Sequence, residues 1–445
     1  MPDLVSRDLS HVWHPCSQMR DYERFPPLEV VSASGSRLHL KDGRVLIDAI
    51  SSWWCKSLGH GHPRLKAALA RQMERFEHVI LANTTHELIV SLSERLAALA
   101  PGLNHVFYAG DGSTAVEIAA KMALHAAKIR GGGGARFLAL ENGYHGETAL
   151  TLALGDLGLY RDPYREILPP VSFLRGLPYV DSDRHPLWAD CSEAWPALER
   201  QLEENLPGLC AVVVEPILQG AGGMRFYSAD FLRRLREWTR ARGVILIADE
   251  ILTGFGRTGA MLACDHAGVV PDLLCLSKGL TAGWLPMSAV LVSDGIYDLF
   301  YGEYGQGRDF LHSNTYSGNA LAAAVALEAL DIYRDEDIPG RVRRDHAALA
   351  SSWARVGEAT GRLKNLRCLG AVAAAELCGP GTGAGERAGF RVYQQAVARG
   401  ALLRTLGDTV YWLLPLNAGA EVIGELEGIT TEAIRAVLGG KPPGF

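Results

Sequence analysis

The sequence predicts an α/β fold whose central sheet is mostly parallel and is covered by helices on both faces. Short apolar runs, of the kind buried on both faces of a sheet, recur from residue 106 onward. Helical patterns lie between several of these runs, and such strand–helix alternation is typical of parallel sheets. The chain has 445 residues, which is long enough for a large core and for two domains.

The individual elements follow from the spacing of the apolar residues. Helical spacing predicts helices at 63–76, 87–98, 113–129, 229–242 and 319–334. Continuous apolar runs predict strands at 106–109, 137–140, 211–215, 244–248, 273–276 and 289–293. Weaker strand signals appear near the N-terminus, at 28–31 and 37–40.

We expect the chain to divide into three parts. Residues 1–62 are an irregular segment that contributes to a small domain and to the active site, and 63–334 form a large domain. Residues 335–445 have the mixed pattern of a smaller α+β domain. Ile338, Pro339 and Gly340 mark the expected boundary, because proline and glycine interrupt the helical pattern that precedes them.

Composition argues against several classes of partner. With 44 basic and 50 acidic residues the net charge is −6, which disfavours nucleic acid and anionic membranes as partners. No apolar run approaches the ~20 residues of a membrane span, and no export signal is visible. The eight cysteines lack CxxC pairing, as reduced cytosolic thiols do, so we expect a cytoplasmic enzyme. His60 and His62 have no carboxylate partner in sequence, and no metal site is predicted.

The most informative residue is Lys278, which comes two residues after the predicted strand 273–276 and should project from its end. Asp249 likewise follows the predicted strand 244–248. A pyridoxal 5′-phosphate (PLP) enzyme needs such a pair. Its lysine must lose a proton near neutral pH to hold the aldehyde as a Schiff base, and its carboxylate must keep the ring nitrogen protonated. Alone, Lys278 is more simply explained as a surface lysine.

Two glycine-rich segments are candidates for binding anions. Residues 110–114 (GDGST) follow a strand and open a helix, where backbone N–H groups can reach a phosphate, although a simple N-cap explains the pattern slightly better on its own. Residues 254–259 (GFGRTG) match the dinucleotide-binding pattern by letter. That interpretation fails, because weak helix formers follow and the next strand ends in Lys278 instead of an acidic residue. Arg257 is better explained as a contact for an anionic substrate.

Aromatic residues supply candidate pocket walls. Tyr144, in the loop 142–146 (NGYHG) after a strand, can place its ring against a flat cofactor, although a surface tyrosine in a turn is the simpler alternative. Trp53 and Trp54 are adjacent and cannot both face one core comfortably. One of them is therefore a candidate wall of a pocket.

These segments resemble the class III, ornithine-aminotransferase-like PLP enzymes of fold type I. The resemblance runs from about residue 11 to about 415 and is carried by 11–15 (HVWHP), 48–54 (DAISSWW), 142–146 (NGYHG), 215–224 (EPILQGAGGM), 248–251 (ADEI), 254–259 (GFGRTG) and 276–279 (LSKG). The first, second and fourth stretches are similar to the branch that converts 8-amino-7-oxononanoate to 7,8-diaminononanoate in biotin synthesis. S-adenosylmethionine is the expected amino donor.

The resemblance implies roles for particular residues. Lys278, Asp249 and Tyr144 would be catalytic, with Lys278 tethering PLP, Asp249 pairing with its ring nitrogen and Tyr144 stacking on the ring. Gly112 and Ser113 would hold the phosphate through their backbone. The implied substrate-binding residues are Trp53, Cys16, Arg257, Ser313, Arg404 and Tyr411, with Arg404 pairing with the oxononanoate carboxylate.

Thr315, in the stretch 312–319 (HSNTYSGN), matches a threonine that reaches the phosphate from the neighbouring subunit. The resemblance therefore implies a homodimer with shared active sites.

One departure concerns Cys16. A well-known form of the family has tyrosine directly after His-Pro, whereas this chain has His14, Pro15 and Cys16. Cysteine is smaller and lacks the phenol hydroxyl, so the donor pocket is expected to differ in width or shape. Lysine, which some members are thought to use, stays open as an alternative donor.

Three other functions are alternatives for this sequence. One is a class III transaminase for ω-amino acids or polyamines that uses pyruvate or 2-oxoglutarate. A second is a PLP-dependent mutase or decarboxylase. The third is a ligand-sensing regulator, which would need a DNA-binding segment, and no basic helix-turn-helix pattern appears in the sequence.

Overall fold

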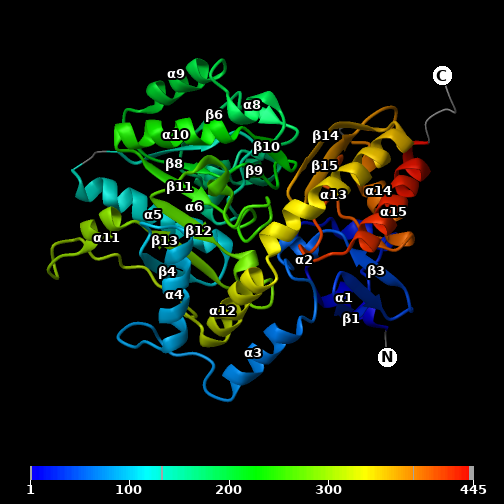
Figure 1. Ribbon diagram of the computed structural model, residues 1–445, viewed down its shortest axis with the longest axis horizontal. Helices are drawn as coiled ribbons and strands as arrows, with labels where there is room; N and C mark the ends of the chain where they lie inside the picture. The colour runs from blue at the N-terminus through cyan, green and yellow to red at the C-terminus, as the bar shows by residue number, and fades with distance from the viewer. Residues whose placement is uncertain (1–2, 132–133, 384, 440–445) are drawn as a thin grey trace.

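The larger lobe of the protein is built on a seven-stranded sheet with the strand order β4-β13-β12-β11-β8-β5-β6 (Figure 1). The computed structural model describes residues 3–131, 134–383 and 385–439. The strands are β4 (His105–Ala109), β5 (Arg136–Leu140), β6 (Val171–Leu174), β8 (Leu209–Val214), β11 (Ile245–Asp249), β12 (Leu273–Leu276) and β13 (Ser288–Val292). All of them run in one direction except β13, which is antiparallel to both of its neighbours. The predicted, mostly parallel α/β sheet is confirmed.

Both faces of this sheet are covered, which explains why its strands have continuous apolar sequences. Ile245 and Ile247 pack into a cluster with helix α5 (Gly112–Ile129), whereas Leu246 between them packs with helix α10 (Ala229–Arg242). Residues that alternate along one strand thus reach opposite helical layers. Strand β6 was not predicted, and its composition shows why. It lies at the sheet edge and only Leu174 in it is buried, so it lacks the apolar run that marks the central strands.

The longer predicted helices are present with small shifts at their ends. α3 (Pro63–Met73) stops three residues before the predicted end, and α12 (Ala320–Asp335) is shifted by one residue. The remaining helices are α1 (Leu4–His11), α2 (Ser51–Trp54), α4 (Glu87–Leu99), α6 (Ala149–Leu154), α7 (Gly158–Arg161), α8 (Pro186–Ala189), α9 (Trp195–Asn205), α11 (Asp294–Phe300), α13 (Ile338–Thr360), α14 (Ala388–Ala398) and α15 (Ala420–Leu438). Short 3₁₀ turns are η1 (Met19–Glu23), η2 (Asp162–Ile167), η3 (Ala263–Ala267) and η4 (Lys278–Thr281).

The smaller lobe combines both ends of the chain (Figure 1). One sheet has the order β1 (Val30–Ser34), β2 (Arg37–Leu40), β3 (Val45–Asp48) and β16 (Ala401–Leu402), and β16 pairs in parallel with β3. A second, antiparallel sheet consists of β14 (Leu363–Leu369), β15 (Val372–Leu377) and β17 (Thr409–Trp412). Helices α13, α14 and α15 share one apolar cluster with the second sheet. A small sheet of β7 (Tyr179–Val180), β10 (Arg225–Tyr227) and β9 (Leu218–Gln219) belongs to the larger lobe.

The expected boundary between residues 334 and 335 falls inside the last turn of α12, just before the two-residue connection 336–337 to α13. Pro339 and Gly340 lie inside the first turn of α13, where proline is well tolerated because that position needs no backbone N–H bond. The division into parts 1–62, 63–334 and 335–445 stays a prediction, and residues 1–2, 132–133, 384 and 440–445 of it lie outside the described residues.

Helix α2 is a left-handed turn. Ser51, Ser52, Trp53 and Trp54 have φ of 48°, 43°, 71° and 71°. This conformation costs L-residues roughly 1–2 kcal/mol each, so the surrounding contacts must hold it. The hydroxyl of Ser51 donates to the Leu413 carbonyl at 2.6 Å, and the indole N–H of Trp54 donates to the Tyr411 hydroxyl at 2.9 Å. Both tryptophans line one cavity, whereas the sequence predicts this for only one of them.

Over the described ranges, with their gaps at 132–133 and 384, we find no helix long and apolar enough to cross a membrane. The same residues contain no cluster of three or more histidine, cysteine, aspartate or glutamate side chains that could hold a metal ion.

Candidate active site

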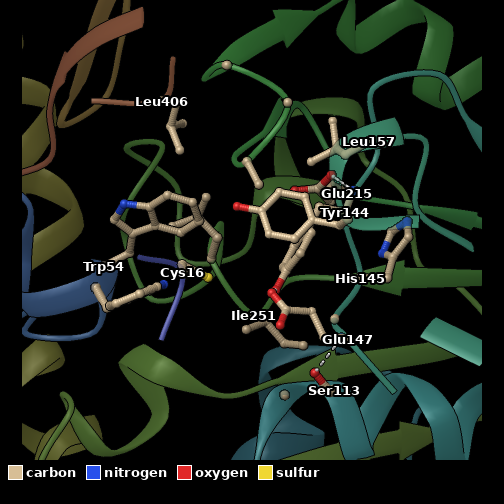
Figure 2. A pocket seen from close by; sticks show the side chains of 18 of the residues that line it. Cys16, Trp54, Ser113, Tyr144, His145, Glu147, Leu157, Glu215, Ile251 and Leu406 are labelled. Carbon is tan, nitrogen blue, oxygen red and sulfur yellow. Dashed lines mark hydrogen bonds between the residues drawn. The ribbon is translucent and has the colours of Figure 1, made fainter. Parts of the chain in front are cut away.

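A cavity of about 710 Å³ lies at the carboxyl ends of the parallel strands. Asp249 is the last residue of β11, and Lys278 comes two residues after β12. Tyr144 and His145 lie in the loop after β5, and Glu215 directly follows β8. Carboxyl ends of parallel strands meet at the same edge of a sheet, and this brings five chemically active side chains together. Figure 2 shows Cys16 and Trp54 on one side of the cavity, across from Tyr144 and Glu147.

The carboxylate of Asp249 is buried and paired with an imidazole. Its Oδ2 lies 2.8 Å from Nδ1 of His145, and its Oδ1 accepts from the backbone N–H of Ile251 at 3.2 Å. Burial alone would lower the pKa of His145, but the hydrogen bond and charge of Asp249 outweigh it and raise that pKa. The imidazole is therefore biased toward its positive form and places a positive charge against the buried Asp249 carboxyl.

Glu215 adds a second buried acid beside this pair. Its Oε1 accepts from the backbone N–H of Gly220 and its Oε2 from that of Tyr144, both at 2.9 Å. Burial, reinforced by the charge of Asp249, raises the pKa of Glu215 to about 7, although His145 and the two N–H donors oppose the shift. Glu215 thus holds the Tyr144 loop in place.

Lys278 extends into the cavity from a strained position. It has φ of 40°, in the left-handed region, and begins the 3₁₀ turn η4. Burial lowers the pKa of Lys278, and the negative charges of Asp249 and Glu215 only partly oppose that shift. Its Nζ lies 5.0 Å from the ring centroid of Trp54. A lysine whose pKa is lowered supplies more of the free amine that nucleophilic and proton-transfer chemistry need.

The N-terminus of α5 forms another wall of the cavity. Asp111 caps this helix by accepting from the backbone N–H of Thr114 at 2.9 Å, while Gly112 and Ser113 line the cavity. Gly146 packs so closely that an added Cβ would collide with the Ser113 hydroxyl. Both interpretations of the segment 110–114 are therefore compatible with the structure, since Asp111 provides the cap and the free N–H groups face the cavity.

Tyr144 lines the cavity and reaches toward a carboxylate. Its hydroxyl donates to Oε1 of Glu147 at 2.9 Å, and burial together with the Glu147 charge raises the pKa of this phenol. The backbone N–H of Glu147 donates in turn to the Ser113 hydroxyl at 3.4 Å (Figure 2). One short segment thus connects Tyr144 with the helix terminus.

Most of the predicted substrate-binding residues also line this cavity. The guanidinium of Arg404 lies 4.6 Å from the ring centroid of Trp53 and donates to the Cys16 carbonyl at 2.8 Å. Tyr411 is almost fully buried and accepts from Trp54. The structure thus brings together four of the six predicted substrate-binding residues, namely Cys16, Trp53, Arg404 and Tyr411.

Three predicted residues lie elsewhere. Arg257 is buried outside the cavity lining, and its Nη1 donates to the Leu414 carbonyl at 2.7 Å. Ser313 and Thr315 are exposed on the loop between α11 and α12, and the Thr315 carbonyl lies 2.8 Å from Nε2 of His78. Neither lines the cavity of its own chain. Their roles, like those of the residues inside the cavity, stay predictions at this point.

Sequence reasoning missed three residues of the site. His145 stands beside Tyr144 and Glu215 follows an apolar run, so strand-end position was a usable signal for both. Tyr160 lies on the short helix α7, which has no apolar periodicity to mark it. The rings of Tyr160 and Tyr144 come into contact only in the folded chain, with centroids 6.0 Å apart.

A lysine at a strand end, a buried carboxylate and an open helix N-terminus around one cavity define an aminotransferase-like site. The family model for class III aminotransferases matches residues 18–434, and the chain belongs to this family. It is 40% identical over 409 residues to the adenosylmethionine-8-amino-7-oxononanoate aminotransferase of Synechococcus elongatus, covering 91% of this chain and 94% of that protein.

Two solved structures show the same fold. The adenosylmethionine-8-amino-7-oxononanoate aminotransferase of Methanocaldococcus jannaschii superposes with a TM-score of 0.89 at 29% identity, covering 98% of this chain and 99% of that one. An amine transaminase from an uncultivated Pseudomonas species, in its PLP-bound form, gives a TM-score of 0.88 at 30% identity, covering 96% and 99%. The fold is that of the PLP-dependent transferases, and PLP is the cofactor of this family.

The residues of the cavity fit PLP. An aldehyde needs an amine, and Lys278 provides one whose pKa is lowered by burial. A protonated ring nitrogen needs a buried anion, and Asp249 provides it with support from His145. A phosphate needs N–H donors free of side-chain bulk, and the glycines at 112 and 146 keep the N-terminus of α5 open.

Proposed function

We propose that this protein transfers an amino group to 8-amino-7-oxononanoate, giving 7,8-diaminononanoate for biotin synthesis, with S-adenosylmethionine as donor. In one cavity, Lys278 lies against Trp54 and Arg404 lies against the neighbouring Trp53, and this combination carries the proposal. It is supported by 40% identity to a relative named adenosylmethionine-8-amino-7-oxononanoate aminotransferase. We place the reaction in the cytoplasm, which is supported by the absence of a disulfide among the described cysteines.

Arg404 suits the carboxylate of such a substrate. Its guanidinium is held on the face of Trp53 and by the Cys16 carbonyl, which leaves N–H donors for a carboxylate. Trp53 and Trp54 are consecutive, so the left-handed turn of α2 sets the spacing between Arg404 and Lys278. A substrate with a carboxylate at one end and an oxo group near the other matches this layout.

When bound, PLP supplies an electron-accepting ring. We assign Asp249, supported by His145, to hold a proton on the ring nitrogen, because a buried carboxylate stabilises that positive charge. Ser113 and the N-terminus of α5 would hold the phosphate, and Tyr144 would lie against the ring. Lys278 would tether the cofactor and, once its amine is free, move the proton to and from the substrate carbon.

We also propose that the protein is a homodimer whose two active sites share residues. Thr315 is exposed and lies outside the cavity of its own chain. The loop that carries it exposes large apolar side chains, including Tyr304 at 96%, Leu311 at 91% and Tyr316 at 67%. Exposed apolar side chains in one region mark an interaction surface. A second copy of the chain would cover them and receive Thr315 at its phosphate site.

The half-reactions test the proposed function directly. The visible absorbance of the PLP-loaded protein should fall on addition of S-adenosylmethionine, because the amino group moves onto the cofactor, and return on addition of 8-amino-7-oxononanoate. We expect the return to be at least ~100-fold faster than with pyruvate, because pyruvate is too short to place its oxo carbon beside Lys278 and its carboxylate on Arg404 at the same time. Stopped-flow spectroscopy measures both steps.

Other results would assign other functions. Recovery with pyruvate or 2-oxoglutarate, but not with 8-amino-7-oxononanoate, would replace the proposal with an ω-amino acid or polyamine transaminase. Loss of absorbance with lysine, but not with S-adenosylmethionine, would keep the reaction and change the donor. A change in substrate without any transfer of nitrogen would indicate a mutase or decarboxylase.

Sharing of residues between subunits can be tested by mixing two inactive partners. In a mixed dimer of Lys278→Ala and Thr315→Ala chains, one site would carry both changes and the other would carry neither. After subunit exchange, about a quarter of all sites should regain wild-type affinity for PLP, as isologous pairing requires. Thr315→Ala alone should weaken PLP binding by about 10- to 100-fold, the value of one hydrogen bond to a charged group.

Spectrophotometric titration with PLP counts the restored sites. Asp309→Ala, six residues away on the same exposed loop, is the control for a change of the loop itself. If mixing restores no high-affinity site although subunits have exchanged, Thr315 acts on its own chain or not at all.

A further inference from the structure

Tyr160 lies at the substrate end of the cavity but has no role in the proposed reaction so far. It comes from α7, and its ring meets that of Tyr144 edge to face at 65°, with centroids 6.0 Å apart. Cys16 lines the same cavity, where burial raises the pKa of its thiol and the Tyr160 hydroxyl opposes that rise. Together with the Tyr144–Glu147 hydrogen bond, this places two phenols, a thiol and a carboxylate in one place. We call Cys16, Tyr144, Glu147 and Tyr160 the Tyr160 corner (Figure 2 labels the first three).

The hydroxyl of Tyr160 is available to a ligand. Within the described part of the chain it has no oxygen or nitrogen hydrogen-bond partner, and a thiol is only a weak one. By contrast, the Tyr144 hydroxyl is already committed to Glu147. The neighbouring side chain of Leu159 is 87% exposed, whereas Tyr160 is partly buried and its ring contacts that of Tyr144.

The charges at this corner select the kind of group that binds there. Burial and the Glu147 charge raise the pKa of the Cys16 thiol, which keeps it neutral. Glu147 is the anion of the corner, and phenol oxygens accept hydrogen bonds. The cation of Arg404 is held by Trp53 and the Cys16 carbonyl and is assigned to the substrate carboxylate. An ammonium group, which has donors only, matches the remaining acceptors.

We propose that Tyr160 is a specificity-determining residue whose hydroxyl binds the amino group that stays on the substrate, next to the reacting carbon. This inference rests on the proposed function, because 8-amino-7-oxononanoate carries an amine on the carbon beside its oxo group. The hydroxyl of Tyr160 and the carboxylate of Glu147 flank that second nitrogen. A monoamine of equal length has no group to place there.

The test compares two amines that differ only in this nitrogen. Tyr160→Phe keeps the ring that packs on Tyr144 and removes the hydroxyl. We expect kcat/KM for the half-reaction with 7,8-diaminononanoate to fall by about 10- to 100-fold, the value of a hydrogen bond to a charged group. With 7-aminononanoate it should change by less than about twofold, because no hydrogen bond is lost. A purely structural role would lower both rates alike.

Two further variants complete the design. Tyr164→Phe is the matched control, because Tyr164 is 53% exposed on the adjacent turn η2 and does not line the cavity. Cys16→Tyr in the Tyr160→Phe background should restore at least part of the lost preference by returning a phenol to the corner. Cys16 also borders a second cavity of about 680 Å³, which leaves room for the larger side chain.

The outcomes separate this inference from the proposed function. If Tyr160→Phe slows both amines equally, or neither, Tyr160 does not bind the second nitrogen, and wild-type turnover of 7,8-diaminononanoate still supports the proposed reaction. If the wild-type protein reacts with 7-aminononanoate but not with 7,8-diaminononanoate, both are overturned. Selective loss with the diamine, reversed by Cys16→Tyr, supports the assignment.

Discussion

Replacement of Lys278 by alanine should abolish transamination while leaving the fold intact. Turnover is expected to fall by at least ~10⁴-fold, the upper range for a positioned acid–base group, because the same amine also tethers the cofactor. The visible absorbance of tethered PLP should disappear. Since burial already disfavours the charge of Lys278 and lowers its pKa, removing this side chain should not lower the melting temperature. Absorbance spectra, single-turnover kinetics and thermal denaturation measure the three effects.

Lys56 provides a matched control for this change. It also has a pKa lowered by burial and lies on a tryptophan, 5.5 Å from the ring centroid of Trp284, but it does not line the cavity. Lys56→Ala should keep the absorbance and the half-reactions. If Lys278→Ala retained both, the assignment of PLP chemistry to this cavity would be wrong.

Replacement of Asp249 by asparagine should have the second largest effect. It keeps the shape of the side chain but removes the charge beside His145 and, as proposed, beside the ring nitrogen. Removing one partner of a buried charge pair costs about 3–5 kcal/mol, which corresponds to about 10²- to 10⁴-fold in kcat/KM for both half-reactions. The reaction with either substrate should suffer alike, because the ring serves both.

A second measurement does not depend on activity. The hydrogen bond and charge of Asp249 raise the pKa of His145 against the effect of burial. In the Asp249→Asn protein without PLP, NMR titration should therefore show a lower pKa for His145. Asp230→Asn is the control, because Asp230 is a buried aspartate on α10, paired with Arg234 and remote from the cavity lining. It should lower thermal stability and leave the cofactor spectrum unchanged. An unaltered His145 titration would contradict the coupling.

The fold was largely predictable because burial leaves a direct trace in sequence. Strands buried on both faces, such as β8 and β12, consist of continuous apolar residues, and the sequence predicts both ends of α10 correctly. The edge strand β6 leaves no such trace, because half of its environment is polar. The left-handed turn of α2 was equally invisible. Its conformation depends on anchors at Tyr411 and Leu413 that are remote in sequence.

For the site, position at a strand end was the effective signal. It identifies Lys278 and Asp249, and it applies to Glu215 directly after β8 and, less directly, to His145 in the loop after β5. Tyr160 could not be found in this way. Its place beside Cys16 depends on how α7 and the N-terminal segment meet in the folded chain. Residue spacing therefore predicts the residues of PLP chemistry better than it predicts the residues that shape the substrate pocket.

The parallel pairing of β3 with β16 has a consequence for biosynthesis. Ile47 is paired with Ala401, which lies 354 positions later in the chain (401 − 47). Translation at roughly 5–20 residues per second separates the two strands by roughly 20–70 s. During this interval the edge of β3 that pairs with β16 has no partner, because β16 has not yet been synthesised. The segment that carries Cys16 and Trp53 can then take its final place only after Arg404 has been synthesised, so the substrate pocket is among the last parts of the protein to form.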